Sequence, residues 1–290
     1  MKTIREIQTV RASDKNPVRR WQRWWRQQPP TRQDRFANLT PVAAVILFMA
    51  AIASAFWYLR GEEIEREQEA VSRDVEYAQQ RLRLRLLERQ EQVMRLARDI
   101  SNREVRKEQF VARAEALVQQ YPEYLSLSWV DERRNIVATQ SVSNLLHSQP
   151  LRPGDALPLG DTETHYSLSR DLLQAIYGVL EPEDGPKDGG LPLLQLHTPL
   201  TNERGQFSGV LMAEYTLEGL LRYGIPTEIL AKYAVSLVSA EGETLAGQTI
   251  PARKHPWPAL PWTPPAANEF RVPVSPVGNG LLLRAQAWRT

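Results

Sequence analysis

Residues 191–224, LPLLQLHTPLTNERGQFSGVLMAEYTLEGLLRYG, contain two apolar stretches joined by a short polar one. Leu193 to Leu200 reads as a strand, Asn202 to Gly205 as a polar turn and Val210 to Tyr215 as a second strand. Leu217 to Arg222 then begins a helix. Strands joined by so short a turn pair antiparallel, so the pattern predicts a compact mixed domain built on antiparallel strands.

Two shorter stretches repeat the strand–turn–strand pattern. LSLSWVDERRNIVAT (Leu125 to Thr139) and VSLVSAEGETLAG (Val235 to Gly247) superpose at an offset of 108 residues. The alignment places Val130 on Val238, Arg134 on Gly242, Val137 on Leu245 and Ala138 on Ala246. An internal repeat of this kind predicts two related modules. Between them, Ser167 to Leu180 is predicted to form a helix.

The composition changes at Tyr121. Seventeen of the 21 prolines and 14 of the 15 glycines follow it, whereas residues 62–120 are dense in Glu, Gln, Arg, Leu and Ala. These residues favour helix, so residues 60–120 are predicted to form a long charged helix. Ser and Asn favour helix caps, so a break is expected near Ser101-Asn102.

Apolar residues recur along this helix at close to helical spacing. They are Val71, Val75, Ala78, Leu82, Leu86, Val93, Leu96, Ala97 and Ile100. The stripe predicts that the helix packs on the domain in part. It also predicts pairing with a second copy, although the stripe is too weak for a strict coiled coil.

An uncharged run precedes the charged helix. Phe36 to Leu59 contains no Asp, Glu, Lys or Arg. The almost wholly apolar part, Leu39 to Leu59, would span roughly 30 Å as a helix, which is the hydrocarbon thickness of a bilayer. Trp57 and Tyr58 end the run as an interfacial aromatic belt does. The run predicts a transmembrane helix over residues 37–59.

A buried core helix and a cleaved signal peptide are the two other interpretations of the run. A buried core helix rarely needs so many apolar residues. A cleaved signal peptide is suggested by Ala53-Ser-Ala55, which has the small residues of a cleavage site. The segment that precedes the run is far longer than an ordinary signal-peptide amino-terminal region, which favours an uncleaved anchor.

Charge predicts the orientation of this anchor. Residues 1–35 carry ten Lys or Arg against three Asp or Glu, a net charge of +7, and the whole chain carries +2, so residues 36–290 carry −5. Basic flanks stay in the cytoplasm, which places the amino terminus inside and the rest outside. Tryptophans and arginines mixed over residues 19–26 suit the inner headgroup layer. The anchor explains this patch, so nucleic acid is not an expected partner.

The composition argues against several classes of enzyme. The chain has no cysteine, so it has no disulfide framework and no thiol or Cys-ligated metal chemistry. Its four histidines, His147, His165, His197 and His255, are scattered without metal-site spacing. Nucleophile elbows and phosphate-binding loops are absent. We therefore expect no catalytic residue, no metal and no cofactor.

These residues carry a resemblance to a family. A long helix leaving an anchor, then SWVDERRNIVAT, then TPLTNERGQFSGVLMAEYTLEGLL resembles the extracytoplasmic double Cache (PAS-like) sensor region of bacterial transmembrane sensor histidine kinases. The later stretch EFRVPVSPVGNGLLLRAQAW resembles its smaller membrane-proximal module. The aromatic–Arg signature of many amino-acid-binding relatives is not visible, and the second module is short.

The resemblance implies an α+β chain with one transmembrane helix, a long charged helix and one or two PAS-like antiparallel-sheet modules. Five regions are expected: a cytoplasmic basic segment (1–36), the anchor (37–59), the long helix (60–120), a membrane-distal module (121–230) and a membrane-proximal module (231–290).

The resemblance also implies a function. The chain is expected to be the periplasmic input region of an inner-membrane receptor. The receptor is expected to be a homodimer and to pass a ligand signal through helices to a cytoplasmic histidine kinase. A PAS-like domain holds small molecules between its sheet and crossing helices. The residues expected near such a site are Trp129, Tyr166, Tyr177, His197 and Tyr215. The rival class is an anchored envelope scaffold that binds a periplasmic protein and no small molecule.

Overall fold

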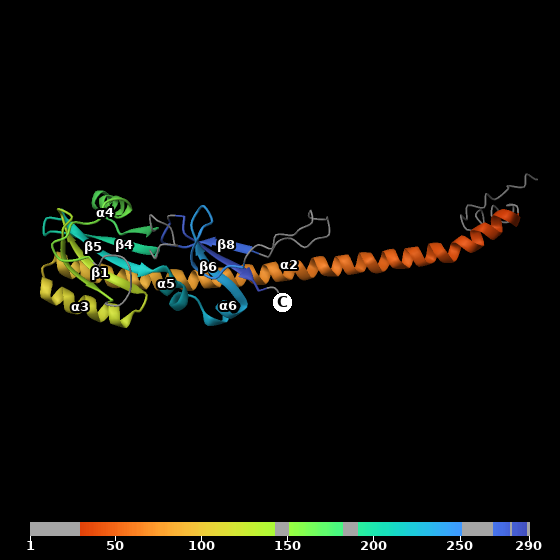
Figure 1. Ribbon diagram of the computed structural model, residues 1–290, viewed down its shortest axis with the longest axis horizontal. Helices are drawn as coiled ribbons and strands as arrows, with labels where there is room; N and C mark the ends of the chain where they lie inside the picture. The colour runs from red at the N-terminus through yellow and green to blue at the C-terminus, as the bar shows by residue number, and fades with distance from the viewer. Residues whose placement is uncertain (1–29, 143–150, 182–190, 251–268, 279, 289–290) are drawn as a thin grey trace, which may run out of the picture. The chain divides into compact units, whose positions relative to one another are not determined.

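The structure, a computed structural model, describes residues 30–142, 151–181, 191–250, 269–278 and 280–288. Contacts between residues divide the chain into two compact units, Met1–Arg66 and Glu67–Thr290. The first unit holds the beginning of helix α2 (Pro30–Ser101). The second holds the end of α2 and the remaining described elements (Figure 1).

The described part of the chain contains one helix, α2, that is long and apolar enough to cross a membrane. The apolar window of that helix is not buried by the protein. Residues 41–59, which make up most of the predicted span, are exposed along their whole length. An exposed helical run of this kind fits the predicted anchor by length and composition.

The long charged helix breaks where the sequence predicts. Helix α2 ends at Ser101, and α3 (Lys107–Gln120) follows after a short connection. Arg103 adopts a left-handed backbone with φ of 60°. Arg106 donates its backbone N–H to the side chain of Gln109 at 2.9 Å, which caps the start of α3.

A five-stranded antiparallel sheet follows, in the order β2-β1-β5-β4-β3. Its strands are β1 (Tyr124–Asp131), β2 (Ile136–Ser141), β3 (Ile176–Leu180), β4 (Leu193–Thr201) and β5 (Phe207–Thr216). The predicted turn between β4 and β5 is confirmed, because Gly205 donates to the carbonyl of Asn202 at 2.8 Å. The Asn202 side chain fixes this turn by accepting from the N–H groups of Arg204 and Gln206.

The helix predicted over Ser167–Leu180 is wrong in its second half. Helix α4 covers Asp161–Leu172, and the chain then turns through Leu173, which has φ of 50°. The following residues form β3, which pairs with β4 along Ile176–Leu180. This segment, IYGVL, is rich in β-branched and aromatic residues, which favour strands. Its pairing with β4 adds it to the sheet as an edge strand.

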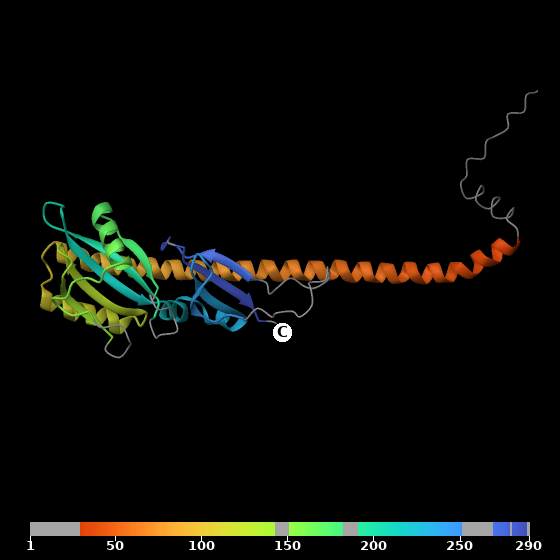
Figure 2. The ribbon, with the colours of Figure 1, turned by 45° about the horizontal axis from the view of Figure 1, so that its top comes forward.

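A second, four-stranded antiparallel sheet has the order β7-β6-β9-β8. After α5 (Leu217–Gly224) and α6 (Thr227–Lys232) it is built from β6 (Tyr233–Val238), β7 (Thr244–Gly247), β8 (Glu269–Pro273) and β9 (Leu282–Ala287). Figure 2 shows this sheet beside α2. Lys232 and Tyr233 bond to Asp74 of that helix at 3.2 and 2.9 Å.

The internal repeat is confirmed in its backbone geometry. The strand register shifts between Trp129 and Val130 in the first sheet and between Leu237 and Val238 in the second, 108 residues later. The aligned turn residues Arg134 and Gly242 both have positive φ, 66° and 89°. Arg134 donates to the carbonyl three residues earlier, and so does Gly242, in both cases at 3.0 Å. The same bulged hairpin is therefore built twice.

Helices cover the two faces of the first sheet (Figures 1 and 2). Helix α4 lies on one face, and α3 together with the end of α2 lies on the other. Each face has its own apolar cluster. The larger one includes Leu127, Leu196 and Leu211 with the apolar residues of α2 and α3, while the smaller one includes Val130, Tyr166 and Met212.

The predicted apolar stripe of α2 belongs to the larger cluster. All nine of its residues, from Val71 to Ile100, are buried within the chain. The predicted packing on the domain is confirmed. The prediction that the same stripe also pairs with a second copy is wrong, because the chain's own sheets already cover it. Homodimerisation itself stays a prediction.

Candidate functional site

Polar side chains from three neighbouring strands line up on the face of the first sheet that α4 covers. Register places Glu214 of β5 opposite both Ser126 of β1 and Gln195 of β4. Side chains two residues apart on a strand share a face, so His197 lies on the same face as Gln195. We call Ser126, Gln195, His197 and Glu214, with His165 of α4, the polar cluster.

Hydrogen bonds join the cluster into a chain. Ser126 Oγ donates to Glu214 Oε2 at 2.6 Å, and Gln195 Nε2 donates to Glu214 Oε1 at 2.9 Å. The amide oxygen of Gln195 lies 3.0 Å from His197 Nε2. Because the amide nitrogen of Gln195 already serves Glu214, its oxygen must accept, and His197 therefore carries its proton on Nε2.

His165 closes the cluster from the helix side. Its ring lies over the backbone of Gly178 so closely that a Cβ at this position would overlap it. The ring centroids of His165 and His197 are 5.9 Å apart. Gly178 thus has a steric role: it lets the α4 histidine reach the sheet opposite Gln195, its partner in the register.

Both histidines have a buried nitrogen with no hydrogen-bond partner in the described part of the chain, Nδ1 in each case. Burial lowers the pKa of His197 to about 3, with a smaller contribution from His165. Burial also lowers the pKa of His165, against the attraction of Asp161. His197 is therefore neutral at pH 7, and its Nδ1 is a buried acceptor without a donor.

The carboxylate of Glu214 has neutral partners. Its two side-chain hydrogen bonds come from a hydroxyl and an amide. Among the residues that the structure describes, no lysine or arginine forms an ion pair with it. The cluster therefore offers two kinds of acceptor, a carboxylate and an imidazole nitrogen. The nearby hydroxyls of Ser128 and Thr139 on the same face bond to each other at 2.8 Å.

The five residues predicted to contact a ligand divide between the two faces. His197 belongs to the polar cluster, and Tyr166 lies on the same face, where its hydroxyl donates to the Asp131 carbonyl at 2.7 Å. Trp129, Tyr177 and Tyr215 lie on the opposite face, toward α2 and α3. Ligand contact by any of the five stays a prediction.

The three aromatics on the helix side are part of the core. Trp129 meets Phe110 of α3 edge to face at 6.0 Å, and Tyr215 stacks on Tyr124 at 4.7 Å. The Tyr177 hydroxyl donates to the Leu86 carbonyl of α2 at 3.4 Å. These rings link the sheet to the long helix rather than to the polar cluster.

Sequence reasoning missed His165, Gln195, Ser126 and Glu214 as members of the site. The sequence around Glu214 could have indicated the site. Glu214 is a charged residue inside VLMAEYT, a strand that is otherwise apolar apart from its end. A charged side chain in an apolar strand is costly without polar partners, and Glu214 has such partners on the α4 side of the sheet.

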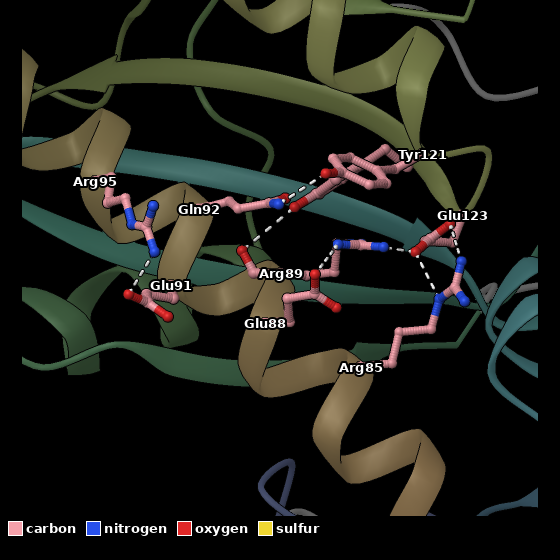
Figure 3. A network of polar contacts seen from close by, with 9 residues as sticks. Arg85, Glu88, Arg89, Glu91, Gln92, Arg95, Tyr121 and Glu123 are labelled. Atoms are coloured by element: carbon pink, nitrogen blue, oxygen red, sulfur yellow. Dashed lines mark hydrogen bonds and ion pairs between the residues drawn. The ribbon is translucent and has the colours of Figure 1, made fainter.

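A second polar network joins α2 to the sheet (Figure 3). Arg85 and Arg89, one helical turn apart, donate to the Glu123 carboxylate at 2.9 and 2.8 Å. Glu123 is fully buried. Burial would raise the pKa of Glu123, but the bonds from the two arginines outweigh it and lower the pKa. The guanidinium of Arg89 also lies 3.6 Å from the centre of the Tyr121 ring.

Glu123 also touches the connection to the second sheet. Its carbonyl accepts from Thr216 N–H at 3.1 Å, and the Thr216 hydroxyl caps α5 by accepting from Gly219 N–H at 3.2 Å. A Cβ at Gly219 would lie 3.1 Å from the Glu123 Cα. The network therefore joins the long helix, the first sheet and α5, which leads to the second sheet, at one residue.

No group of three His, Asp or Glu side chains is placed to hold a metal ion in the described residues. His165 and His197 form a pair, while His147 and His255 lie outside the described residues.

No protein-family model matches the sequence, and no curated protein sequence matches it. Solved structures are similar to it in fold. The ligand-binding domain of the Pseudomonas aeruginosa amino acid chemoreceptor PctB, solved with L-Arg, is 14% identical, with a TM-score of 0.50, over 77% of this chain and 95% of that domain.

Two further structures are similar at slightly lower scores. The ligand-binding domain of PctC from P. aeruginosa, solved with GABA, is 16% identical with a TM-score of 0.49, over 77% of this chain and 100% of that domain. The extracellular domain of rpHK1S-Z16, described as a histidine kinase, is 13% identical with a TM-score of 0.49, over 76% and 95%. The likeness to PctB confirms the predicted Cache fold.

Proposed function

We propose that this chain is the extracytoplasmic sensing region of a bacterial membrane receptor and that it binds a small molecule at the polar cluster. The observation that carries the proposal is the pair of acceptors there, the Glu214 carboxylate without a cationic partner in the described residues and the buried Nδ1 of His197. A buried acceptor such as the His197 Nδ1 is costly when unpaired, so a ligand that supplies a donor would satisfy it.

The chemistry of the cluster favours a ligand with an ammonium or amine group. An amine offers several N–H donors and a positive charge, which suits a carboxylate and a neutral imidazole nitrogen. A ligand recognised mainly through its own carboxylate would require a cation, and the cluster contains none. The fold supports this use, since the PctB domain, to which the chain is similar in fold, was solved with L-Arg.

The route of the signal follows from the packing. The polar cluster lies on the α4 side of the sheet, and Tyr177 and Tyr215 on the other side contact or face α2. A shift of β4 or β5 on ligand binding would therefore reach α2 through these rings and through the Glu123 network. We infer that α2 carries the signal to the membrane, and that a histidine kinase is the output.

A thermal-shift screen of the full chain in detergent tests the proposal. The panel contains amines, amino acids, organic acids and purines. A ligand at 100 times its dissociation constant should stabilise the protein by about 2.7 kcal/mol, which raises the melting temperature by about 5 °C or more for a domain of this size. We expect the hits to be amines.

Matched variants locate the site. Glu214→Gln keeps the shape of the side chain and should abolish the shift caused by an amine. Glu203→Gln changes an exposed glutamate in the β4–β5 turn and should leave it intact. Absence of any shift across the panel, together with no small molecule bound to the purified protein by mass spectrometry, would instead favour the scaffold that binds a periplasmic protein.

A further inference from the structure

The second sheet carries a row of polar side chains in the place that the polar cluster takes in the first sheet. In the first sheet, Ser128 of β1 lies opposite Met212 of β5, and Met212 lies opposite His197 of β4. The internal repeat places Ser236 on Ser128, 108 residues later. Register therefore identifies the matching row of the second sheet, which is Ser236, Arg284 and Arg271.

This row lies on the face of the second sheet that points away from α2. Neighbouring residues of a strand point to opposite faces. Val235 and Leu237, on either side of Ser236, belong to the larger apolar cluster with the α2 residues, and so does Leu283, next to Arg284. The polar cluster also lies on the face away from α2. The two sheets thus present equivalent faces, one with the polar cluster and the other with two arginines.

Arg284 is a buried cation with neutral partners. Only 8% of its surface is exposed. Its Nε donates to Ser236 Oγ at 3.0 Å, and its Nη2 donates to Thr244 Oγ1 of β7 at 2.8 Å. Among the residues that the structure describes, no Asp or Glu forms an ion pair with it. A buried charge without an opposite charge is costly, so an anion beside Arg284 would be stabilising.

Arg271 brings a second guanidinium to the same face. It lies on β8, an edge strand of the sheet, and 45% of its side chain is exposed. A Cβ added at Gly242, in the turn between β6 and β7, would lie 3.5 Å from Arg271 Nη1. Thr244, which accepts from Arg284, is two residues further along the same hairpin. Both guanidiniums therefore reach the β6–β7 hairpin.

The acid beside Arg271 is already used. Glu269 of β8 accepts from Arg271 Nε and from Gln286 Nε2. Burial raises the pKa of Glu269, but these hydrogen bonds outweigh it and lower the pKa, so the carboxylate is ionised at pH 7. Two arginines against one glutamate leave a surplus of one positive charge on this face.

Other acids near the row do not cancel this surplus by pairing with its arginines. Glu241 and Glu243 lie in the hairpin turn, where both are exposed. Neither forms an ion pair with Arg271 or Arg284 within the described ranges. Residues 251–268, which join β7 to β8 in the sequence, contain no Asp or Glu and so have no carboxylate side chain to offer.

We propose that this face of the second sheet is a second ligand site, where Arg284 and Arg271 bind a small monocarboxylate. Arginine presents paired N–H donors that match the two oxygens of a carboxylate. The hydroxyls of Ser236 and Thr244 accept from Arg284 and have protons of their own to donate. One surplus charge balances a monoanion, whereas a phosphate monoester brings about −1.5 to −2 at pH 7.

The carboxylate site is separate from the amine site of the first sheet, and either can exist without the other. The polar cluster offers acceptors to an amine. The matching face of the second sheet offers donors and positive charge to a carboxylate. The repeated hairpin therefore builds two sites of opposite chemistry in one chain.

Thermal shifts of the full chain in a neutral detergent test the carboxylate site. The probes are acetate, propionate and benzoate as sodium salts, with sodium phosphate for comparison, and each is titrated against sodium chloride at the same ionic strength. We expect at least one carboxylate to raise the melting temperature saturably, beyond the effect of chloride. These probes carry no amine, so their shifts and those of the amines report separate successes and failures of the two sites.

Variants of the two arginines locate the site. Arg271→Gln removes a charge from an exposed edge strand and should weaken binding by roughly tenfold or more, because a charge-assisted hydrogen bond is lost. Arg284→Lys keeps the charge but loses the planar fork, so it should also weaken binding. Arg81→Gln removes an exposed arginine of α2 and should leave the affinity unchanged.

Glu269→Gln should change the affinity in the opposite direction. It raises the surplus from one positive charge to two and takes the acid partner away from Arg271. The carboxylate should then bind more tightly by roughly two- to fivefold, the effect of one partly exposed charge. A purely structural role of the row would give no such gain in affinity.

Three results would overturn the proposal. The first is that no carboxylate shifts the melting temperature more than chloride does, and the second is that phosphate does so and the carboxylates do not. The third is a carboxylate affinity that Arg271→Gln and Arg81→Gln change equally, which would indicate general screening of charge. Melting without ligand checks that each variant is folded, and Arg271→Gln decides the test where Arg284→Lys is destabilised.

Discussion

At the scale of single residues, one buried carboxylate decides how the long helix meets the sheet. Glu123 accepts from Arg85 and Arg89 of α2 and has no exposed surface. Removing one member of a buried ionic group leaves the others buried and uncompensated. Loss of the Glu123 carboxylate is therefore expected to lower the free energy of unfolding far more than loss of a surface glutamate does.

Glu123→Ala should lower the free energy of unfolding of the sensor domain by about 3–5 kcal/mol. Urea unfolding followed by tryptophan fluorescence measures this change. Glu203→Ala is the control, because Glu203 forms an exposed ion pair with Arg103 at 3.3 Å, which should contribute about 1 kcal/mol at most. Equal losses for the two variants would contradict the assigned role of Glu123.

His197 predicts how stability depends on pH. Its pKa in the folded protein is about 3, well below the value of about 6.5 for a free histidine. The unfolded chain therefore binds a proton between these values while the folded chain does not, so the stability contributed above pH 6.5 is lost as the pH falls toward 3. The slope for one such histidine is about 1.4 kcal/mol per pH unit.

Unfolding free energies measured between pH 7.5 and pH 5 check this expectation. The natural chain should lose stability as the pH falls below about 6.5. His197→Gln, which cannot titrate and keeps a polar group beside Gln195, should show a smaller slope. The same slope in both proteins would mean that His197 is not held neutral by its burial.

At the scale of elements, α2 has a buried side and an exposed side, and two leucines that are two residues apart distinguish them. Leu82 is 1% exposed and packs in the core, whereas Leu84 is 58% exposed. The two side chains are chemically the same, so any difference between their variants reports their surroundings.

Leu82→Ala should cost about 2–5 kcal/mol of stability, because it leaves a cavity beneath α2. Leu84→Ala should change the free energy of unfolding by about 0.5 kcal/mol or less. Chemical unfolding of the two variants measures both changes. A large loss of stability for Leu84→Ala would place that residue in the core instead.

Some of these elements could be predicted from the sequence and others could not. The stripe from Val71 to Ile100 was predictable because its period is helical, and the turn at Asn202 because its side chain chemistry is local. The hairpin repeat was predictable from its fixed offset. The strand over Ile176–Leu180 was not, because its pairing with β4 outweighs the local pattern.

The candidate site was less predictable than the fold. Alternation along β4 places Gln195 and His197 on one face, yet it does not tell which face is apolar core. The answer depends on register with β5, which brings Glu214 beside Gln195, and on α4, which brings His165 over Gly178. These are contacts between residues far apart in the sequence. For the same reason Trp129, Tyr177 and Tyr215 were grouped with His197 although they lie on the other face.

At the scale of the whole molecule, the charge distribution predicts topology. Residues 1–35 carry +7 and the remainder carries −5, so the amino terminus should stay in the cytoplasm. Alkaline phosphatase, which is active only in the periplasm, should be active when fused after Arg289. Activity of a cytoplasmic reporter alone at that site would reverse the orientation and remove the basis for periplasmic sensing.

The central claim is that a ligand bound at the polar cluster changes α2. Hydrogen exchange of the full chain, with and without an amine that raises the melting temperature, tests this claim most directly. We predict slower exchange in α4 and β4 and a changed rate in the turns of α2 that carry Arg85 and Arg89, with all these changes lost in Glu214→Gln. Protection confined to other elements, or an α2 that exchanges identically with and without ligand, would contradict the account.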